Sequence, residues 1–428
     1  MTGTSARATG APGRPLMEIV RAEPARLLAF GQGAICAQGG FGWLDDHGRI
    51  DPTQPRFLYI AGRIAHTGAL GALAGLDGAE ALAAHGVHSL RTTFTDPSAP
   101  GWPAALPGGH APGDPARSAY ASSFVVLAGA SGAIAGIPGA QQLLAESLDA
   151  VESLFWDEQD GAFREDDRRD PTDTPGYRGM NSNMHMVEAL LAAHSAGAGE
   201  EHLDRAARIA RRAVRAAQQN QWRLPEHFDA RWRPLLDHNR HHHRDPFRPY
   251  GSTVGHWLEW SRLLLHLEAA SLASAPRHDT AWMRTASLTL FERAVAEGWG
   301  VDGNEGFVYT VDWDGAPVVR RRLHWVLAEA IAAAAVLSTA TADPSYARWR
   351  DRWLAYARAH HLDLERGSWH HELDPENRPS PLIKTGKADI YHSTQAMLWA
   401  GIPDLPLRGG LAASLAAHRA ARVGAASR

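Results

Sequence analysis

Segments with helical periodicity that are apolar on nearly every side recur along the chain. A helix of this kind is buried on all sides, whereas a surface helix keeps one polar face. Each segment is rich in alanine and contains aliphatic or aromatic residues on successive turns. The segments are Arg56–Gly75, Ser118–Ile137, Asn183–Ser195, His256–Ala270, Leu323–Thr339 and Tyr391–Gly401.

Every one of these apolar segments carries a large polar or aromatic side chain near its beginning. Successive members of the set are roughly 55–70 residues apart, and a regular recurrence of this kind is typical of repeat architectures. The side chains are Arg63, Tyr120, His185, His256, Trp325 and His392.

Amphipathic segments alternate with the apolar ones. In Glu201–Gln219, alanine and aliphatic residues occupy one helical face and arginines the other. Pro138–Leu154, Thr280–Glu297 and Tyr346–His361 follow the same pattern. An inner ring of six buried helices inside an outer ring of six amphipathic ones predicts an all-α (α/α)6 barrel. An open superhelix is the alternative, but a polar residue at each inner start favours closure around one cavity.

The connections between helices predict short β-hairpins, because Asp- or Gly-rich turns lie between aromatic or β-branched residues in 155–163, 227–235, 308–317 and 369–377. No linker divides the chain, so we expect a single catalytic domain over residues 16–408. Residues 1–15 have the composition of a disordered tail, and residues 409–428 that of a helix or a second tail.

Composition is that of an ordinary globular protein, with 44% hydrophobic and 21% charged residues. A formal net charge of −4 gives no electrostatic reason to expect nucleic acid as a partner. No run approaches the length of about 18 apolar residues that a membrane span requires, so no membrane partner is expected. The single cysteine, Cys36, excludes an intrachain disulfide and fits a reducing, cytoplasmic location.

Three histidines at corresponding inner-helix starts, His185, His256 and His392, are the main candidates for chemistry. Histidine titrates near neutrality, so a pair of them can move a proton to and from a carbon atom. Glu188 and Glu259 follow two of them by three residues, where a carboxylate can orient an imidazole or bind a hydroxyl group. These pairs also have the spacing of metal ligands, but the remaining inner starts are poor ligands and we expect no metal.

Other polar residues have more than one interpretation. Arg63 in a buried helix requires a partner or a polar cavity. Tyr120 and Trp325 are core aromatics or stacking surfaces for a sugar, and Asn181 is a site residue or a helix N-cap. The histidine-rich run at 238–243 is interpreted as a solvated loop, since no second ligand cluster has zinc spacing. The chain has no Gly-rich phosphate loop and no serine-centred elbow, which favours proton chemistry without a cofactor.

Four motifs in order resemble the N-acylglucosamine 2-epimerase superfamily, and most of all its branch of D-mannose and sulfoquinovose isomerases. The resemblance runs from about Gly31 to Pro403, and Phe41–Leu44 (FGWL) agrees with that branch. The motifs are Arg178–Ala189 (RGMNSNMHMVEA), Phe247–Trp260 (FRPYGSTVGHWLEW), His324–Ala330 (HWVLAEA) and Lys387–His392 (KADIYH).

The resemblance implies an (α/α)6 barrel enzyme that needs no metal or organic cofactor and acts on a monosaccharide through a cis-enediol(ate). It implies reversible conversion of D-mannose to D-fructose, with sulfoquinovose isomerisation and sugar 2-epimerisation as alternatives. His256 and His392 match the acid/base pair of the family. The sugar-binding residues that it implies are Arg63, Tyr120, Asn181, His185, Glu259, Trp325 and, in the loop before His256, Arg248.

Some positions depart from the pattern of this branch. Tyr59 stands where relatives tend to have tryptophan, and His371 and Ala388 stand where some present amide side chains. These differences concern the group at sugar C6. A glycosidase or lyase with a carboxylate pair among Glu188, Glu259 and Asp389, and a non-catalytic carbohydrate-binding barrel, are the alternatives from other classes. Homo-oligomerisation is left open by the sequence.

Overall fold

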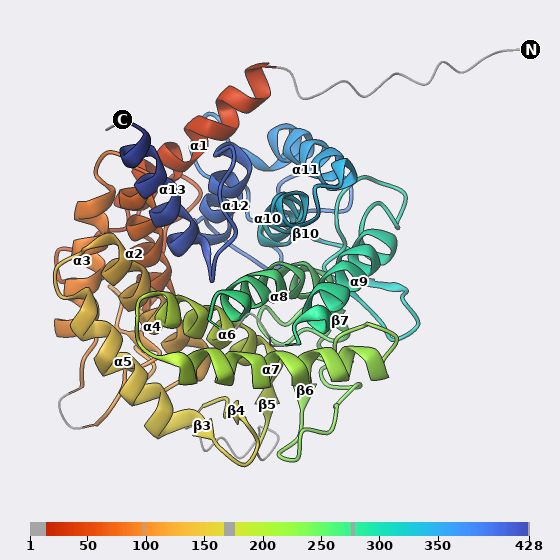
Figure 1. Ribbon diagram of the computed structural model, residues 1–428, viewed down its shortest axis with the longest axis horizontal. Helices are drawn as coiled ribbons and strands as arrows, with labels where there is room; N and C mark the ends of the chain where they lie inside the picture. Colours follow the sequence, from red (N-terminus) through yellow and green to blue (C-terminus); the bar gives the residue numbers. More distant parts are fainter. Residues whose placement is uncertain (1–13, 97–98, 167–175, 275–278, 427–428) are drawn as a thin grey trace, which may run out of the picture.

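The computed structural model describes residues 14–96, 99–166, 176–274 and 279–426. The prediction of a disordered tail therefore falls almost wholly outside the described residues, and helix α1 (Arg14–Gln32) begins where that tail was expected to end. The helices form an (α/α)6 barrel, as predicted. Pairs of helices follow one another around a ring in chain order, one member of each pair inside and one outside (Figure 1).

The inner ring consists of the apolar segments. Their buried faces extend around the whole helix, because other helices surround each of them. In α8, for example, seventeen of the residues from Val254 to Ser271 are buried, Trp257 and Trp260 among them. The inner helices are α2 (Leu58–Leu73), α4 (Ala119–Ala135), α6 (Met180–Ser195), α8 (Val254–Ser274), α10 (His324–Thr341) and α12 (Tyr391–Gly401).

The outer ring is formed by amphipathic helices, each packed on the inner helix next to it in the sequence. Helix α1 supplies the outer partner of α12 and so joins the end of the ring to its beginning, since α12 also packs on α2. The other outer helices are α3 (Ala79–Thr92), α5 (Ala140–Phe155), α7 (Glu200–Gln219), α9 (Ala281–Gly298) and α11 (Pro344–Tyr356), which continues as a π-helical turn, Ala357–His361.

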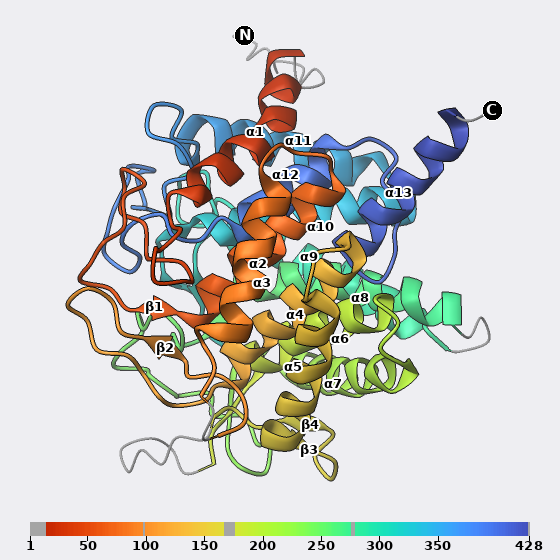
Figure 2. The same cartoon turned by 90° about the vertical axis from the view of Figure 1, so that its left-hand side faces the viewer.

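Short antiparallel strand pairs gather in the loops that precede the inner helices, as the sequence predicted. Figure 2 shows β1 and β2 on one side of the molecule and α13 on the other. Only some of the pairs are local hairpins; others join loops that are distant in sequence. The pairs are β1 (Arg56–Phe57) with β2 (Ala105–Leu106), β3 (Trp156–Asp157) with β4 (Ala162–Phe163), β5 (Arg178–Gly179) with β6 (His227–Phe228), β7 (Ser252–Thr253) with β8 (Thr310–Val311), β8 with β9 (Pro317–Val319), and β10 (Arg322–Leu323) with β11 (Glu372–Leu373).

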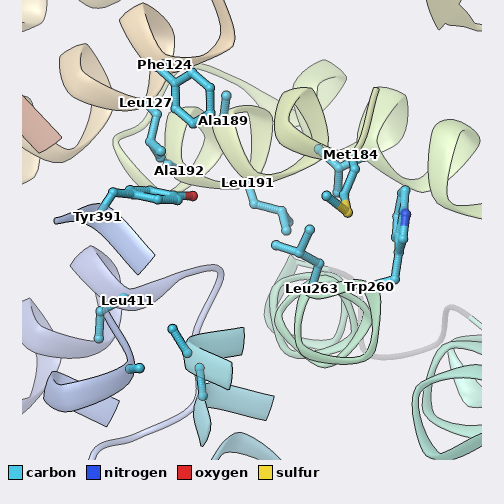
Figure 3. Close-up of a cluster of buried hydrophobic side chains, with 14 of the residues drawn as sticks. Phe124, Leu127, Met184, Ala189, Leu191, Ala192, Trp260, Leu263, Tyr391 and Leu411 are labelled. Carbon is cyan, nitrogen blue, oxygen red and sulfur yellow. The ribbon is translucent and has the colours of Figure 1, made fainter. Parts of the chain in front are cut away.

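The C-terminal helix α13 (Leu411–Ala426) closes the barrel at the end opposite these loops. It packs against α2, α4 and α6. Its Leu411 belongs to a buried cluster that includes Leu127, Leu191 and Leu263 of the inner helices (Figure 3). The barrel interior is therefore open at the N-terminal ends of the inner helices and covered at their C-terminal ends.

Helix α10 is the one element of the described chain that is long and apolar enough to cross a membrane by length and composition, whereas the sequence suggested no such segment. Its mean hydropathy over His324–Thr341 is 1.3, and 72% of this stretch is buried inside the fold. Its place in the inner ring, with other helices around it, accounts for that composition.

Small residues allow the inner helices to approach closely. A Cβ atom added at Gly62 of α2 would lie 2.6 Å from the backbone oxygen of Phe124 in α4. We therefore expect Gly62→Ala to push α2 away from α4 and to destabilise the fold by about 1–3 kcal/mol. Thermal unfolding would show this as a lower Tm. Gly424→Ala is the matched control, since a Cβ there meets nothing within 4 Å, and a Tm that falls equally in both variants would contradict the explanation.

Candidate active site

The first turns of the six inner helices face one cavity. All the residues predicted for the site line this cavity except Arg248. They come from six helices that are separated in sequence by outer helices and loops, so the closed ring is what brings them together. The lining residues are Trp43, Tyr59, Arg63, Tyr120, Asn181, His185, Pro246, Phe247, His256, Glu259, Tyr309, His324, Trp325, His371, Lys384, Asp389 and His392.

His256 lies in the first turn of α8 and is held by a carboxylate from another part of the chain. Its Nδ1 is 2.9 Å from Oε1 of Glu226, in the loop before β6. Its ring packs against Trp325, with centroids 5.1 Å apart. The sequence suggested Glu259 as the residue that orients His256, but the structure gives this role to Glu226. With Nδ1–H donated to a carboxylate, Nε2 is the nitrogen left to face a substrate.

His392 has the same arrangement on α12. Its Nδ1 lies 2.8 Å from Oε1 of Glu329, whose other oxygen accepts a hydrogen bond of 2.9 Å from Nε of Arg262. Burial, and after it the Arg63 guanidinium, lowers the pKa of His392 well below its ordinary value. The ring is therefore neutral at neutral pH, and its free Nε2 is a base. Trp325 lies beside this histidine too, with ring centroids 5.7 Å apart.

Arg63 is fully buried in charge pairs rather than free in the cavity. Its Nη1 lies 2.5 Å from Oδ2 of Asp389, and its Nη2 donates a hydrogen bond of 3.1 Å to the Tyr120 hydroxyl. The guanidinium also lies 4.3 Å from the Phe124 ring centroid. Burial raises the pKa of Asp389, but the Arg63 charge, together with His392, His324 and the backbone N–H of Tyr391, outweighs burial and lowers it to about 2. Burial raises the pKa of Tyr120 to about 12, so this hydroxyl stays protonated.

His185 and Glu259 form a second pair at the floor of the cavity. Nδ1 of His185 is 3.5 Å from Oε1 of Glu259 and 3.9 Å from Oε2 of Glu188. Burial lowers the pKa of His185 to about 4. Both oxygens of Glu259 are buried without a hydrogen-bond partner among the described residues. Burial, and then the carboxylates of Glu329 and Glu188, raises the pKa of Glu259 well above its ordinary value. Glu259 is thus a neutral acid that can donate a hydrogen bond.

Two groups of buried donors in the described chain are close enough to hold a metal ion: His185 with Glu188 and Glu259, and Glu259 with Glu329 and His392. Arg262 already lies among their carboxylates. Its Nε is 2.9 Å from Glu329, its Nη1 3.4 Å from Glu188 and its Nη2 3.9 Å from Glu259. The guanidinium supplies the positive charge that a cation would bring, so this donor set is better explained as a charge cluster than as a metal centre.

Asn181 lines the cavity from the first turn of α6. Its Oδ1 is buried without a hydrogen-bond partner among the described residues, so it can accept a hydrogen bond from a bound molecule. The alternative interpretation as a helix N-cap is wrong, because Gly179 caps α6.

Arg248 does not reach the catalytic cavity, contrary to its predicted position beside the sugar. It lies 3.7 Å from Asp166 in an ion pair, and its guanidinium is 4.2 Å from the Tyr177 ring centroid. It lines an adjoining hollow instead. The histidine run nearby lies outside the catalytic cavity too, and His241, His242 and His243 line a separate surface depression.

Several residues of the site were not predicted from the sequence. Glu329 could have been found, since it follows Trp325 by four residues and shares its helix face. Glu226 lies in a loop without periodic signal. His324 was not predicted either. It stacks on His371, which the sequence had singled out as a departure from the family pattern, with ring centroids 3.9 Å apart on the cavity wall.

Lys384 also lines the cavity and was not predicted. Its ammonium lies 4.4 Å from the Phe247 ring centroid. No carboxylate among the described residues forms an ion pair with it. Burial, and then the Arg63 charge, lowers the pKa of Lys384 to about 8. The lysine is therefore still mostly charged at neutral pH.

The chain matches the family model described as N-acylglucosamine 2-epimerase (GlcNAc 2-epimerase) over residues 39–396. It is 46% identical to a D-mannose isomerase of Thermobifida fusca over 398 residues, which are 92% of this chain and 96% of the relative. It is 41% identical to a D-mannose isomerase of Pseudomonas cannabina pv. alisalensis over 395 residues, 92% of this chain and 94% of that one.

Solved structures have the same fold. A crystal structure of D-mannose isomerase matches with a TM-score of 0.80 and 27% identity, over 92% of this chain and 99% of the other. A cellobiose 2-epimerase from Spirochaeta thermophila matches with a TM-score of 0.75 and 21% identity, over 91% and 97% of the two chains.

The Arg63–Asp389 pair predicts a specific dependence of stability on acid. The pKa of Asp389 in the folded protein, about 2, lies below its ordinary value of 3.8. The ionised carboxylate therefore contributes fully to the free energy of unfolding above pH 4, and this contribution is lost as the pH falls toward 2. We expect Asp389→Asn to lower the free energy of unfolding by about 3 kcal/mol at pH 7. Between pH 7 and pH 3 the difference in free energy of unfolding between the wild type and this variant should narrow by about 1 kcal/mol.

Urea unfolding of both proteins at several pH values measures this gap. A difference between them that stays constant from pH 7 to pH 3 would show that Asp389 is not held ionised by Arg63.

Proposed function

Because the chain belongs to the N-acylglucosamine 2-epimerase family, we propose that this sugar isomerase converts D-mannose reversibly to D-fructose. Two relatives that are more than 40% identical to it over the aligned residues carry the name D-mannose isomerase. The observation that carries the chemistry is the pair His256 and His392, each with Nδ1 bound to a buried carboxylate and Nε2 left for the sugar. Two histidines in one cavity, each oriented by a carboxylate, are suited to moving protons between neighbouring carbon and oxygen atoms.

The reaction begins with ring opening. His256 moves a proton from the anomeric hydroxyl to the ring oxygen, which breaks the C1–O5 bond and leaves an aldehyde at C1. Glu226 stabilises the imidazolium that forms in passing, because its carboxylate lies 2.9 Å from Nδ1. Trp325 packs beside both histidines and offers a flat face for the sugar.

The isomerisation step then transfers hydrogen from C2 to C1. Nε2 of His392 removes the C2 proton, the electron pair forms the C1–C2 double bond, and the former aldehyde oxygen becomes an enediolate oxygen. The same nitrogen returns the proton to C1 on the same face while the O2 proton moves to O1, which leaves a ketone at C2. No external oxidant or reductant is consumed.

Charge that develops on the enediolate oxygens needs nearby donors. Glu259 is a protonated acid at the cavity floor and can donate directly, and the Tyr120 hydroxyl is held by Arg63 at 3.1 Å. The Arg63 guanidinium is balanced by Asp389. Its role is therefore to fix Tyr120 and to add a positive field, not to act as a free cation. Asn181 and His185 supply further hydrogen-bonding groups to the sugar hydroxyls.

The Lys384 ammonium in the cavity favours sulfoquinovose as a second candidate substrate. An ammonium in the cavity without an ion-pair partner among the described residues suits a sugar with an anionic group at C6, as in sulfoquinovose. Isomerisation at C1 and C2 would proceed by the same steps. The ratio of kcat/KM on sulfoquinovose to that on D-mannose decides between them, and Lys384→Met should lower this ratio at least tenfold if the sulfonate contacts the ammonium.

Product analysis tests the reaction itself. We expect D-mannose incubated with the enzyme in D₂O to yield D-fructose, followed by ¹H NMR, with activity that persists in EDTA. Appearance of D-glucose in place of the ketose would establish 2-epimerisation, in which C2 is reprotonated from the opposite face. Hydrolysis of an aryl glycoside without isomerisation would support a glycosidase.

Substitution of the histidines tests their roles. His392→Ala should lower kcat by about 10²–10⁴-fold because the base is removed. Glu329→Gln should lower kcat and shift the pH dependence of kcat, since the negative partner of His392 is lost. His66→Gln is the matched control: this buried inner-helix histidine bonds Ser131 at 2.9 Å and lies away from the catalytic cavity. A His392→Ala protein that keeps most of the wild-type kcat would refute the assignment.

A further inference from the structure

A second hollow adjoins the catalytic cavity on the loop side of the barrel. Its volume is about 510 Å³, within the range of about 300–1000 Å³ that is usual for small-molecule pockets. Its walls combine an aromatic ring, Tyr177, with the carboxylates of Glu165 and Asp166 and the guanidinium of Arg248. Flat aromatic faces beside charged hydrogen-bonding groups suit a sugar ring, whose faces are apolar and whose edge is hydroxylated. The sugar isomerisation proposed above does not use this hollow.

The two spaces are divided by a thin partition. Tyr59, Tyr120, Asn181 and Phe247 line both of them. Three of these residues belong to inner helices and are fixed by the barrel core. Phe247 is the exception, since it lies in the loop before β7 and its side chain is 44% exposed.

Phe247 is held in place by contacts on both sides. Its ring centroid lies 6.0 Å from that of Tyr59 and 6.1 Å from that of Tyr120, and the Lys384 ammonium lies 4.4 Å from it. Its backbone N–H donates to Oδ1 of Asp245 at 2.9 Å. The exposed Phe247 ring is not part of the hydrophobic core. It packs between two loops and two inner helices, where it can limit the length of a bound sugar.

We propose that Phe247 restricts the enzyme to monosaccharides, and that the hollow behind it is a second sugar subsite that the ring closes off. This inference rests on the isomerase function proposed above. A substituent on the sugar at the end remote from C1 would meet the Phe247 ring. With the ring removed, the catalytic cavity and the hollow join, and a second sugar residue can lie beside Tyr177 and Arg248.

The test is the ratio of kcat/KM on disaccharides to kcat/KM on D-mannose. The probes are 1→4- and 1→6-linked disaccharides with mannose or glucose at the reducing end. We expect Phe247→Ala to raise this ratio at least tenfold over the wild type, Phe247→Leu to raise it less, and Phe247→Tyr, which keeps the ring, to leave it low. Adding Arg248→Ala to Phe247→Ala should lower the disaccharide kcat/KM again, because the second ring loses a wall of its subsite.

Leu382→Ala is the matched control, since this leucine is 49% exposed in the loop that carries Lys384 and lines neither space. Its ratio of kcat/KM on disaccharides to kcat/KM on D-mannose should equal that of the wild type. A Phe247→Ala protein with wild-type Tm and an unchanged ratio would overturn the inference, as would a wild type that already isomerises the disaccharides as fast as D-mannose. A wild type without activity on any aldose would instead refute the proposed function, so the two failures are distinct.

Discussion

Arg262 is the buried charge on which the arrangement of the site depends. Its side chain is 2% exposed and lies among three glutamates from three inner helices. Glu329 accepts its Nε hydrogen bond and at the same time holds His392. Glu188 accepts from its Nη1 and from the Tyr391 hydroxyl. Without this guanidinium, three carboxylates would repel one another in a medium of low dielectric constant, and none could hold a histidine in a fixed orientation.

One arginine cannot neutralise three carboxylates, and this excess negative charge adds to the effect of burial in raising the pKa of Glu259. This residue is the farthest of the three from the guanidinium, at 3.9 Å, and neither of its oxygens has a hydrogen-bond partner among the described residues. Protonation of Glu259 removes the uncompensated charge. The cluster that orients His392 through Glu329 therefore also creates a neutral acid close to that base, and a site that moves protons between adjacent sugar atoms needs both.

The sequence predicted the barrel well because the periodicity of apolar residues, which identifies each helix, is a local signal. Apolar periodicity identified the inner helices within a few residues, and α12 has the predicted bounds, Tyr391–Gly401. It missed α1 and α3, where Pro24 and Gly86 interrupt the helical pattern. Partnerships across the ring were not predictable. The pairing of His256 with Glu259 was inferred because they share a helix face, whereas the true partner, Glu226, comes from a loop whose position depends on the pairing of β5 with β6.

The direction of the inner helices adds a field that no single residue provides. All six present their N-terminal turns to the catalytic cavity, and their C-terminal ends are covered at the far side by α13. The N-terminus of each helix carries about half a positive charge from its unpaired N–H groups. Six such ends around one cavity disfavour protonated histidine and favour an anion. Both effects serve the proposed chemistry, since the base must be neutral and the enediolate is negative. An (α/α)6 barrel thus offers one electropositive mouth, and this chain places its two carboxylate-bound histidines there.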